Sequence, residues 1–338
     1  MSSAVKTVAS GARHAASRIA AIVCETPLLR SPALSEMTGG EVYLKLENLQ
    51  HTGSFKLRGA TNRLLTLSQD ERARGCVAAS SGNHGAAVAY AMQKLDVKGV
   101  IFVPEQTSVA KVEAIRGYGG NVRFYGTDGL DTEQHAREYA EQHDMVYLSP
   151  YNDPEVIIGQ ATCGVEIIDQ LAELDAVFVA VGGGGLISGI GSVLKQHDPD
   201  IDVFGCQPEA SAVMAKSIDA GRILDLSSDP TLSDGTAGGI EPDAITFALC
   251  AELVDDFILV SEDEIAAAMR RFMADHEFVV EGAAGVAVAA ALARRDLISG
   301  RKVVIVICGG NVSQATLDSI SGTTKTQGAQ MSGEIEPG

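Results

Sequence analysis

Four consecutive glycines, Gly182 to Gly185, follow the apolar run Ala176–Val181. Glycine lets the backbone approach an anion closely, and a helix that begins after the run would add the partial positive charge of its N-terminus. One glycine would be enough for a tight turn, so we interpret the four as a phosphate-binding loop. The loop lacks the lysine of a Walker sequence, and Ser188 stands where a dinucleotide pattern needs its third glycine. A phosphorylated cofactor smaller than a nucleotide therefore fits better.

A lysine, Lys56, lies in the segment His51–Ala60, where a turn-like Thr-Gly-Ser stretch leads into a helical pattern. Near a helix N-terminus the ammonium form of a lysine is disfavoured, which suits Lys56 to act as an amine nucleophile that forms a Schiff base. On this segment alone, a solvated surface lysine is the simpler interpretation.

The segment Ala79–Ala86 carries two hydroxyls, an amide and a histidine between a short strand, Cys76–Ala79, and an alanine-rich helical pattern. Its donors could bind a carboxylate and a cofactor oxygen. For His84 alone we favour a histidine that fills the turn and is neither base nor ligand.

Short apolar runs at Val100–Val103, Ala176–Val181 and Val303–Ile307 each end at a glycine or a turn. Runs without polar alternation are typical of parallel strands buried on both faces. Helical patterns such as Leu130–His143 and Glu262–His276 lie between them. The alternation predicts an α/β fold with largely parallel sheets.

The composition bounds the possible partners. The 338 residues include 26 Lys and Arg against 44 Asp and Glu, a net charge of −18, so we expect neither nucleic-acid nor membrane binding. The most apolar stretch, Gly282–Ala293, is too short to cross a bilayer, and residues 1–21 lack the apolar core of a secretion signal. The six scattered cysteines form no C-x-x-C pair, which indicates reduced thiols and argues against structural zinc. We therefore expect a cytoplasmic protein.

Four motifs together resemble one family: Ser54–Ala60, Ser80–Gly85, Gly182–Gly185 and Cys308–Asn311 occur in its order and approximate spacing. The family is that of the pyridoxal-phosphate-dependent threonine/serine dehydratases, which share the tryptophan-synthase-β fold (fold type II) and include serine racemase. The resemblance extends over nearly the whole chain. It implies pyridoxal 5'-phosphate as cofactor and a β-elimination that converts a β-hydroxy amino acid, such as L-threonine or L-serine, to a 2-oxo acid and ammonia.

The resemblance also implies roles for individual residues. Lys56 would carry the cofactor as a Schiff base and later remove the Cα proton, and Ser81 would act on the opposite face in a racemase. Asn83 would bond the ring hydroxyl, and Cys308 would lie beside the pyridine nitrogen. The implied cofactor-binding residues are Phe55, Lys56, Asn83, Gly182, Gly183, Gly184, Gly185, Leu186, Gly235 and Cys308. The implied substrate-binding loop is Ser80, Ser81, Gly82, Asn83 and His84.

For the organisation of the chain, the resemblance implies a two-domain α/β fold with parallel-sheet cores flanked by helices. Residues 1–75 and 150–325 would form a large cofactor-binding domain, and residues 76–149 a small mobile domain that closes over the small-molecule substrate. Residues 326–338 would form a disordered tail. A homodimer or a higher homo-oligomer is expected on the same basis.

The sequence departs from its relatives in two places. Gln207 and Val213 stand where serine racemase and some dehydratases have the carboxylates of a divalent-cation site, so we expect no metal. The stretch Leu232–Phe247 resembles that of the hydroxyectoine-utilisation dehydratases. Within it, Glu241 would either bind an amine on a longer substrate side chain or be exposed and irrelevant.

Three alternatives stay open at this point. The first is an amino-acid racemase of the serine type on the same cofactor, for which Ser81 supplies the hydroxyl. The second is a non-catalytic binding protein that keeps the fold, against which the presence of Lys56 argues. The third is a nucleotide-binding enzyme, which the incomplete phosphate motifs disfavour.

Overall fold

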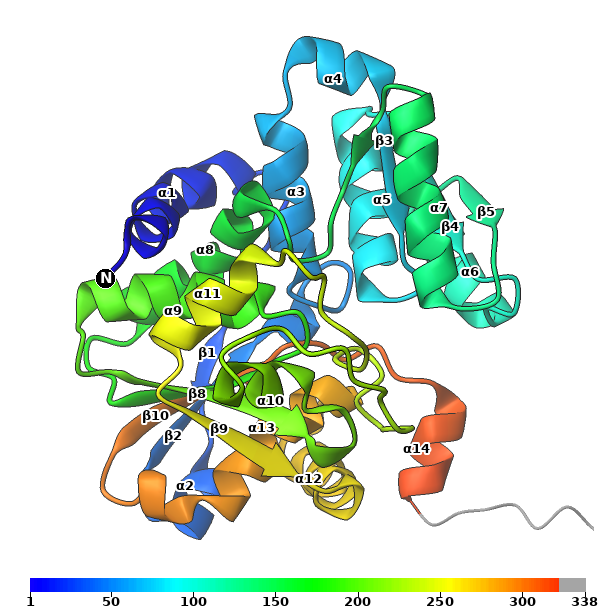
Figure 1. Cartoon of the computed structure of the whole chain (residues 1–338). Helices are drawn as coiled ribbons and strands as arrows, with labels where there is room; N and C mark the ends of the chain where they lie inside the picture. Colours follow the sequence, from blue (N-terminus) through cyan, green and yellow to red (C-terminus); the bar gives the residue numbers. More distant parts are fainter. Residues whose placement is uncertain (322–338) are drawn as a thin grey trace, which may run out of the picture.

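Two separate β-sheets form the framework of the computed structural model, which describes residues 1–321 (Figure 1). The expected tail at 326–338 lies outside the described residues. The larger sheet has six strands in the order β1-β2-β10-β7-β8-β9, and all its neighbours are parallel except β1 and β2. Its strands are β1 (Leu28–Arg30), β2 (Glu41–Leu46), β7 (Ala176–Ala180), β8 (Asp202–Pro208), β9 (Asp256–Val260) and β10 (Lys302–Ile307).

The smaller sheet comes from one continuous stretch of chain. It has four parallel strands in the order β5-β4-β3-β6. These are β3 (Cys76–Ala79), β4 (Gly99–Val103), β5 (Val122–Phe124) and β6 (Val146–Tyr147). In Figure 1 this sheet and its helices form the upper right part of the molecule. The predicted α/β class with parallel sheets is confirmed; the antiparallel edge strand β1 was not predicted, because its three residues carry no distinctive pattern.

Helices cover the sheets on both faces, as fully buried strands require. Around the larger sheet lie α1 (Ser3–Ile19), α2 (Pro32–Thr38), α8 (Pro154–Gln170), α9 (Gly185–His197), α10 (Val213–Asp219), α11 (Ile245–Leu253), α12 (Glu262–His276), α13 (Gly282–Ala293) and α14 (Gln314–Ile320). Helix α3 (Lys56–Thr66) packs against both α8 and α5 and so lies between the two parts, and α4 (Gln69–Arg74) follows it; around the smaller sheet lie α5 (Asn83–Leu95), α6 (Val109–Gly117) and α7 (Gly129–Gln142). Three short 3₁₀ turns complete the elements: η1 (Glu47–Leu49), η2 (Glu209–Ser211) and η3 (Arg295–Leu297).

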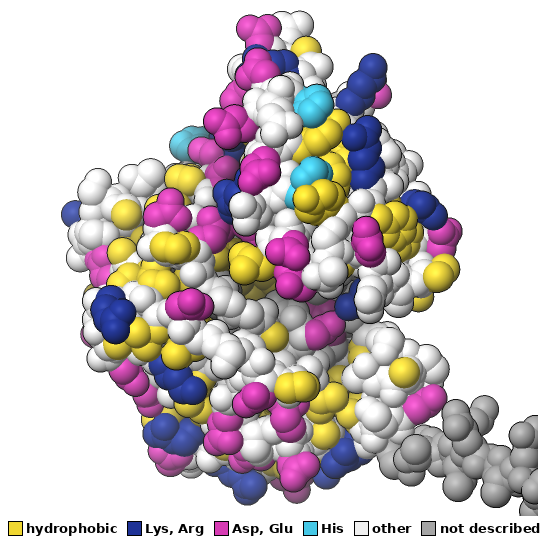
Figure 2. All heavy atoms as spheres, turned by 45° about the vertical axis from the view of Figure 1, so that its right-hand side comes forward, with side chains coloured by type: hydrophobic (Ala, Val, Ile, Leu, Met, Phe, Trp, Pro, Cys, Tyr) yellow, Lys and Arg dark blue, Asp and Glu magenta, His cyan; other side chains and the backbone are white. Residues whose placement is uncertain are grey.

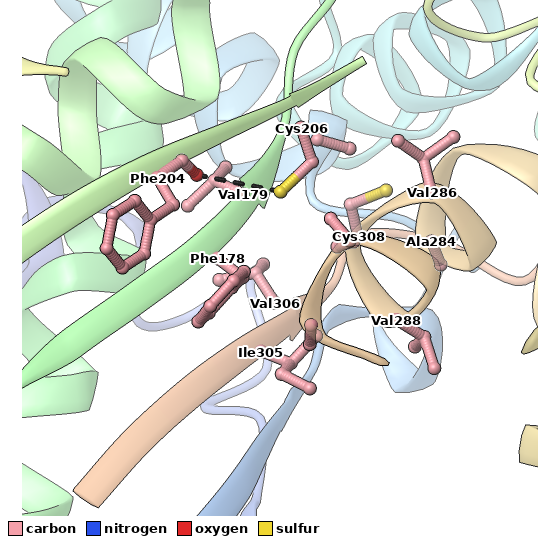
Figure 3. Close-up of a cluster of buried hydrophobic side chains, with 14 of the residues drawn as sticks. Phe178, Val179, Phe204, Cys206, Ala284, Val286, Val288, Ile305, Val306 and Cys308 are labelled. Atoms are coloured by element: carbon pink, nitrogen blue, oxygen red, sulfur yellow. Dashed lines mark hydrogen bonds between the residues drawn. The ribbon is translucent and has the colours of Figure 1, made fainter. Parts of the chain in front are cut away.

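The core of the larger sheet explains why α13 is so rich in alanine. This helix lies directly against β7 and β10, and Figure 3 shows its residues Ala284 and Val288 in the same buried cluster as the strand side chains Phe178 and Ile305. Small helix residues allow close packing on a surface of branched strand residues. The stretch is a buried core helix, and no helix of residues 1–321 is long and apolar enough to span a membrane.

The six cysteines are all unpaired thiols, and only Cys24 is more than slightly exposed. Burial raises the pKa of the thiols of Cys76, Cys163, Cys206 and Cys250. These four groups are therefore neutral core residues at physiological pH.

Candidate active site

A cavity of about 640 Å³ lies where the carboxyl ends of strands from both sheets meet. The segments that follow β3, β7 and β10 all line it, which is where parallel sheets place ligand-binding loops. Figure 2 shows the surface hollowed between the part built on the smaller sheet and the larger body below it. Every residue predicted for the site lines this cavity: Phe55, Lys56, Ser80, Ser81, Gly82, Asn83, His84, Gly182, Gly183, Gly184, Gly185, Leu186, Gly235 and Cys308.

Lys56 is the first residue of α3, and the segment before the helix is tied to the end of β10. The backbone N–H of Phe55 donates to the carbonyl of Cys308 (3.1 Å), and Ser54 forms an isolated antiparallel bridge with Gly309. The Lys56 ammonium donates to the carbonyl of Pro150 (2.9 Å). Burial lowers the pKa of Lys56 to about 8, although Cys308 and Glu281 raise it. The amine is therefore partly neutral near physiological pH, as a nucleophile or base must be.

The four glycines form the turn between β7 and α9. Gly184 has φ +83°, a left-handed conformation that favours glycine, and α9 begins at Gly185. A Cβ on Gly183 would lie 2.4 Å from the Tyr151 ring, so a side chain here would strike the aromatic wall beside the loop. The first-turn N–H groups of α9 have no acceptor within the helix, and they open toward the cavity with the positive end of the helix dipole.

An unpredicted carboxylate, Glu281, joins the site. It lies immediately before α13, is 6% exposed, and lines the cavity. The Asn83 amide nitrogen lies 3.0 and 2.9 Å from its two oxygens, and the backbone N–H of Asn311 donates to it at 3.3 Å. Burial raises the pKa of Glu281 to about 7, and Asp234 adds to the rise, while Asn83, Asn311 and Lys56 oppose it. Sequence reasoning missed this residue because a lone glutamate before an apolar run has no distinctive spacing.

The loop after β3 presents hydroxyls but no titrating histidine. His84 is buried, its Nε2 lies 2.9 Å from the carbonyl of Leu148, and burial together with Lys56 lowers its pKa to about 3. The ring is therefore neutral, in agreement with the prediction that His84 fills the turn. Ser80 accepts from the backbone N–H of Gly82 at 3.2 Å, and Ser81 lies in the cavity wall.

Glu241 fits neither option predicted for it. Its Oε2 lies 2.9 Å from the Asn152 amide nitrogen and 2.8 Å from the guanidinium of Arg137 on α7. Glu241 is not among the residues that line the cavity, and its side chain is only 17% exposed. This carboxylate therefore links the loop of the larger sheet to the helix that covers the smaller one.

Gln207 stands where some relatives have a carboxylate that binds a divalent cation. Its side chain is buried and hydrogen-bonds to backbone groups. Its Nε2 donates to the carbonyl of Val181 (3.0 Å), and its Oε1 accepts from the backbone N–H of Ala215 (2.8 Å). Among residues 1–321, no three His, Cys, Asp or Glu side chains lie close enough together to hold a metal ion.

Comparison with known proteins decides the family. The family described as "Pyridoxal-phosphate dependent enzyme" matches residues 19–309. The chain belongs to the pyridoxal-phosphate-dependent enzymes. It is 42% identical over 299 residues to the L-threonine ammonia-lyase of Thermotoga maritima, covering 88% of this chain and 74% of the relative.

Solved structures agree with this assignment to the pyridoxal-phosphate-dependent enzymes. The processed form of threonine deaminase isoform 2 from Solanum lycopersicum superposes with a TM-score of 0.89 at 35% identity, covering 93% of this chain and 87% of the other. Maize serine racemase superposes with a TM-score of 0.87 at 32% identity, covering 93% and 97%. The predicted fold type II, the pyridoxal 5'-phosphate cofactor and the assignment to β-eliminating ammonia-lyases of hydroxy amino acids are confirmed.

The residues of the cavity fit this cofactor. A phosphate needs several aligned N–H donors, and the glycine turn at the start of α9 offers them beside a wall that leaves no room for a side chain. An aldehyde needs an amine that can lose its proton, and Lys56 lies in the same cavity with a lowered pKa. In addition, the buried hydroxyl of Thr52 lines the cavity and has no hydrogen-bond partner among the described residues.

Proposed function

We propose that this enzyme is an ammonia-lyase for a small β-hydroxy amino acid of the threonine or serine type, with Lys56 as its cofactor-bearing and proton-transferring residue. The observation that carries the proposal is the meeting of Lys56, the glycine turn at Gly182–Gly185 and the Asn83 loop in one cavity. When bound, pyridoxal phosphate supplies the electron sink that stabilises negative charge at the substrate Cα.

The side chains divide the remaining work. The N–H groups of Gly182 to Leu186 would hold the phosphate at the start of α9, and Phe55, which also lines the cavity, would contribute to the binding of the cofactor. The Lys56 amine would take the proton from Cα, because its lowered pKa leaves a large neutral fraction near pH 8. The loop Ser80 to His84 offers hydroxyl and backbone donors to the substrate carboxylate.

Cys308 influences the choice of reaction. Burial raises the pKa of its thiol well above the usual value, and the charge of Glu281 adds to this effect. If Cys308 lies beside the pyridine nitrogen, as the family resemblance implies, its neutral thiol would not hold that nitrogen protonated as a carboxylate would. The cofactor would then delocalise less negative charge from Cα, which would favour loss of the β-hydroxyl over transamination.

We further propose that residues 76–149 act as a small domain that closes on residues 1–75 and 150–325. The separation of the two sheets supports this division. Two ion pairs, Lys111 to Asp234 (3.2 Å) and Arg137 to Glu241 (2.8 Å), join helices of the smaller sheet to the loop 231–244 and would hold the closed arrangement. Closure would bring the Ser80–His84 loop onto the substrate and exclude water. Cytoplasmic location, expected from the scattered cysteines, and assembly as a homodimer or higher homo-oligomer, expected from the family resemblance, are part of the same proposal.

A racemase is the second candidate, because the hydroxyl of Ser81 lies in the cavity and the superposition with maize serine racemase covers almost all of both chains. Chiral analysis of threonine or serine recovered before completion separates the two functions. A dehydratase leaves the remaining substrate in its original configuration, and a racemase returns both enantiomers.

Two experiments test the main proposal. Borohydride reduction followed by peptide mapping is expected to fix the cofactor on the peptide that contains Lys56, and its absence there would refute the assignment. A substrate panel of threonine, serine, 3-hydroxyaspartate and hydroxylated diaminobutyrate, scored for 2-oxo acid and ammonia, is expected to favour the first two. Preference for the diamino substrate would instead support the resemblance of Leu232–Phe247 to the hydroxyectoine-utilisation dehydratases.

A further inference from the structure

The carboxylate of Glu281 lines the cavity, and no step above gives it a role. It stands at the N-terminus of α13, and the absence of a side chain on Gly309 makes room for it, since a Cβ there would lie 2.5 Å from Oε1. It contacts groups from two distant parts of the chain: Asn83 on α5 beside the smaller sheet, and Asn311 after β10 of the larger sheet.

The geometry of the Asn83 amide fixes which of its ends faces Glu281. The nitrogen lies 3.0 and 2.9 Å from the two carboxylate oxygens, while the amide oxygen accepts from the Asn311 side chain at 2.7 Å. The Asn311 amide also donates to the carbonyl of Thr52 (2.9 Å), so its own orientation is set by the backbone. Rotating the Asn83 amide by half a turn would place donor against donor at Asn311 and acceptor against acceptor at Glu281.

The contact between the Asn83 amide and the Glu281 carboxylate leaves one N–H of Asn83 available. The two oxygens of a carboxylate lie too close together to receive one N–H each from an amide whose N–H bonds diverge by about 120°. The two near-equal distances therefore describe one N–H shared by both oxygens, and the second N–H of Asn83 is free to donate to a cofactor oxygen in the cavity.

Some of the groups around Glu281 favour its ionised form, and others oppose it. Its hydrogen-bond partners, the Asn83 amide and the Asn311 backbone N–H, are donors that favour the anion, and the Lys56 ammonium on α3 favours it too. Burial and the Asp234 carboxylate oppose it, and Asp234 is itself paired with Lys111 of α6. Cys308, 4.0 Å from Oε1, is a neutral thiol.

We propose that Glu281 is a positioning residue that acts through Asn83: its carboxylate holds the Asn83 amide with a donor toward the cofactor, and its negative charge helps set the pH at which the bound cofactor titrates. This inference rests on the proposed function, because it needs the cofactor on Lys56. It assigns to Glu281 no direct contact with the substrate.

The test is a pH titration of the visible absorption of the holoenzyme without substrate. In Glu281→Gln, loss of one buried negative charge near the cofactor lowers the midpoint of the titration by about one pH unit, because the protonated, cationic form loses a stabilising partner. If the effect passes through Asn83, the shifts of Asn83→Ala and Glu281→Gln are not additive in the double variant. The matched control is Glu262→Gln, because that carboxylate also accepts a backbone N–H, from Leu232 at 2.7 Å, but does not line the cavity. Its midpoint stays at the wild-type value.

Each result decides the matter. A Glu281→Gln midpoint equal to that of the wild type, or strictly additive shifts in the double variant, would overturn the inference while leaving the proposed function intact. Should Glu281→Gln fail to retain cofactor, Glu281→Asp replaces it: the shorter side chain keeps the charge but withdraws from Asn83, so a smaller shift in the same direction is expected and no shift refutes the idea. A wild-type enzyme with no cofactor fixed on Lys56 would instead refute the proposed function, and this inference with it.

Discussion

Arg58, two residues after the cofactor lysine, provides the sharpest stability prediction. It is fully buried, as are Glu47 and Lys45, and Glu166 completes a cluster of two positive and two negative side chains. The guanidinium donates to both oxygens of Glu47 (2.7 and 2.8 Å), to both oxygens of Glu166 (2.5 and 2.7 Å), and to Thr162 (3.1 Å). Replacing Arg58 with methionine, which fills part of the volume, leaves these acceptors without their partner.

The expected loss is large. Removing one partner of a buried ion pair costs about 3 to 5 kcal/mol, because the remaining charge stays buried without compensation. Here two carboxylates lose their shared partner, while Lys45 still bonds Glu166 at 2.6 Å, so we expect a loss within that range. A domain has about 5 to 15 kcal/mol of stability in total, so the Arg58→Met variant keeps its fold with a much smaller margin.

The assay is equilibrium urea unfolding of the wild type, Arg58→Met and the control Arg13→Met. Arg13 also binds a carboxylate through two nitrogens, Asp169 at 2.9 and 3.1 Å, but both side chains are more than half exposed. An exposed pair contributes about 0 to 1 kcal/mol. Equal losses in the two variants, or a loss below about 1 kcal/mol for Arg58→Met, would show that the burial argument is wrong.

The pH dependence gives an independent check. Burial alone would raise the pKa of Glu47, but the charges and hydrogen bonds of Arg58, with smaller effects from Lys45 and Thr26, hold it below its usual value. A carboxyl with a lowered folded pKa stabilises the protein above its unfolded pKa, and this stability is lost as the pH falls through the folded value. In Arg58→Met burial is no longer opposed by the guanidinium, so the pKa of Glu47 in the folded protein rises and acidification removes less stability from the variant than from the wild type. If the free energy of unfolding fell with decreasing pH in the same way in Arg58→Met and in the wild type, this reasoning would be wrong.

Three further predictions concern the site. Gly183→Ala places a methyl group 2.4 Å from the Tyr151 ring and should weaken cofactor binding at least tenfold in an equilibrium titration, whereas Gly239→Ala, where a Cβ meets open space, should not. The elimination rate should rise with pH through a midpoint near 8, because Lys56 must be neutral to act as base; a flat profile would contradict this role. Glu241→Gln should raise KM severalfold and leave kcat unchanged, because it weakens the ion pair with Arg137 that joins the two parts. An unchanged KM would contradict this prediction.

Much of the fold and site was predictable because the relevant patterns are local. The buried strands read as unbroken apolar runs, and the glycine turn at Gly182–Gly185 needed its residue type for steric reasons that hold in any context. The Lys56 motif indicated a cofactor lysine only together with the other three motifs, because a single lysine before a helical pattern does not distinguish a catalytic from a surface residue. Their meeting in a single cavity follows from parallel topology, which brings the ends of strands to one edge.

What could not be predicted depends on contacts between distant segments. Glu281 meets Asn83 across 198 positions of sequence, and no spacing rule connects them. Glu241 gains its role from Arg137, which only the packing of α7 brings within 2.8 Å. The strand β1 pairs antiparallel because the chain must return along β2, a consequence of the tertiary path rather than of its three residues.

Different helices supply different walls of the cavity. This arrangement affects how the substrate selectivity of such an enzyme can change by mutation. Ser108, Lys111, Ala114, Ile115 and Tyr118 supply one wall from α6 and its flanks, whereas the lysine and the glycine turn come from α3 and α9. Substitutions along α6 can therefore reshape or recharge the space offered to incoming molecules without disturbing the anchoring of the coenzyme. New selectivities can arise by mutation along one helix, and a library confined to Ser108, Lys111, Ala114 and Tyr118, which leaves the core residue Ile115 unchanged, would sample them.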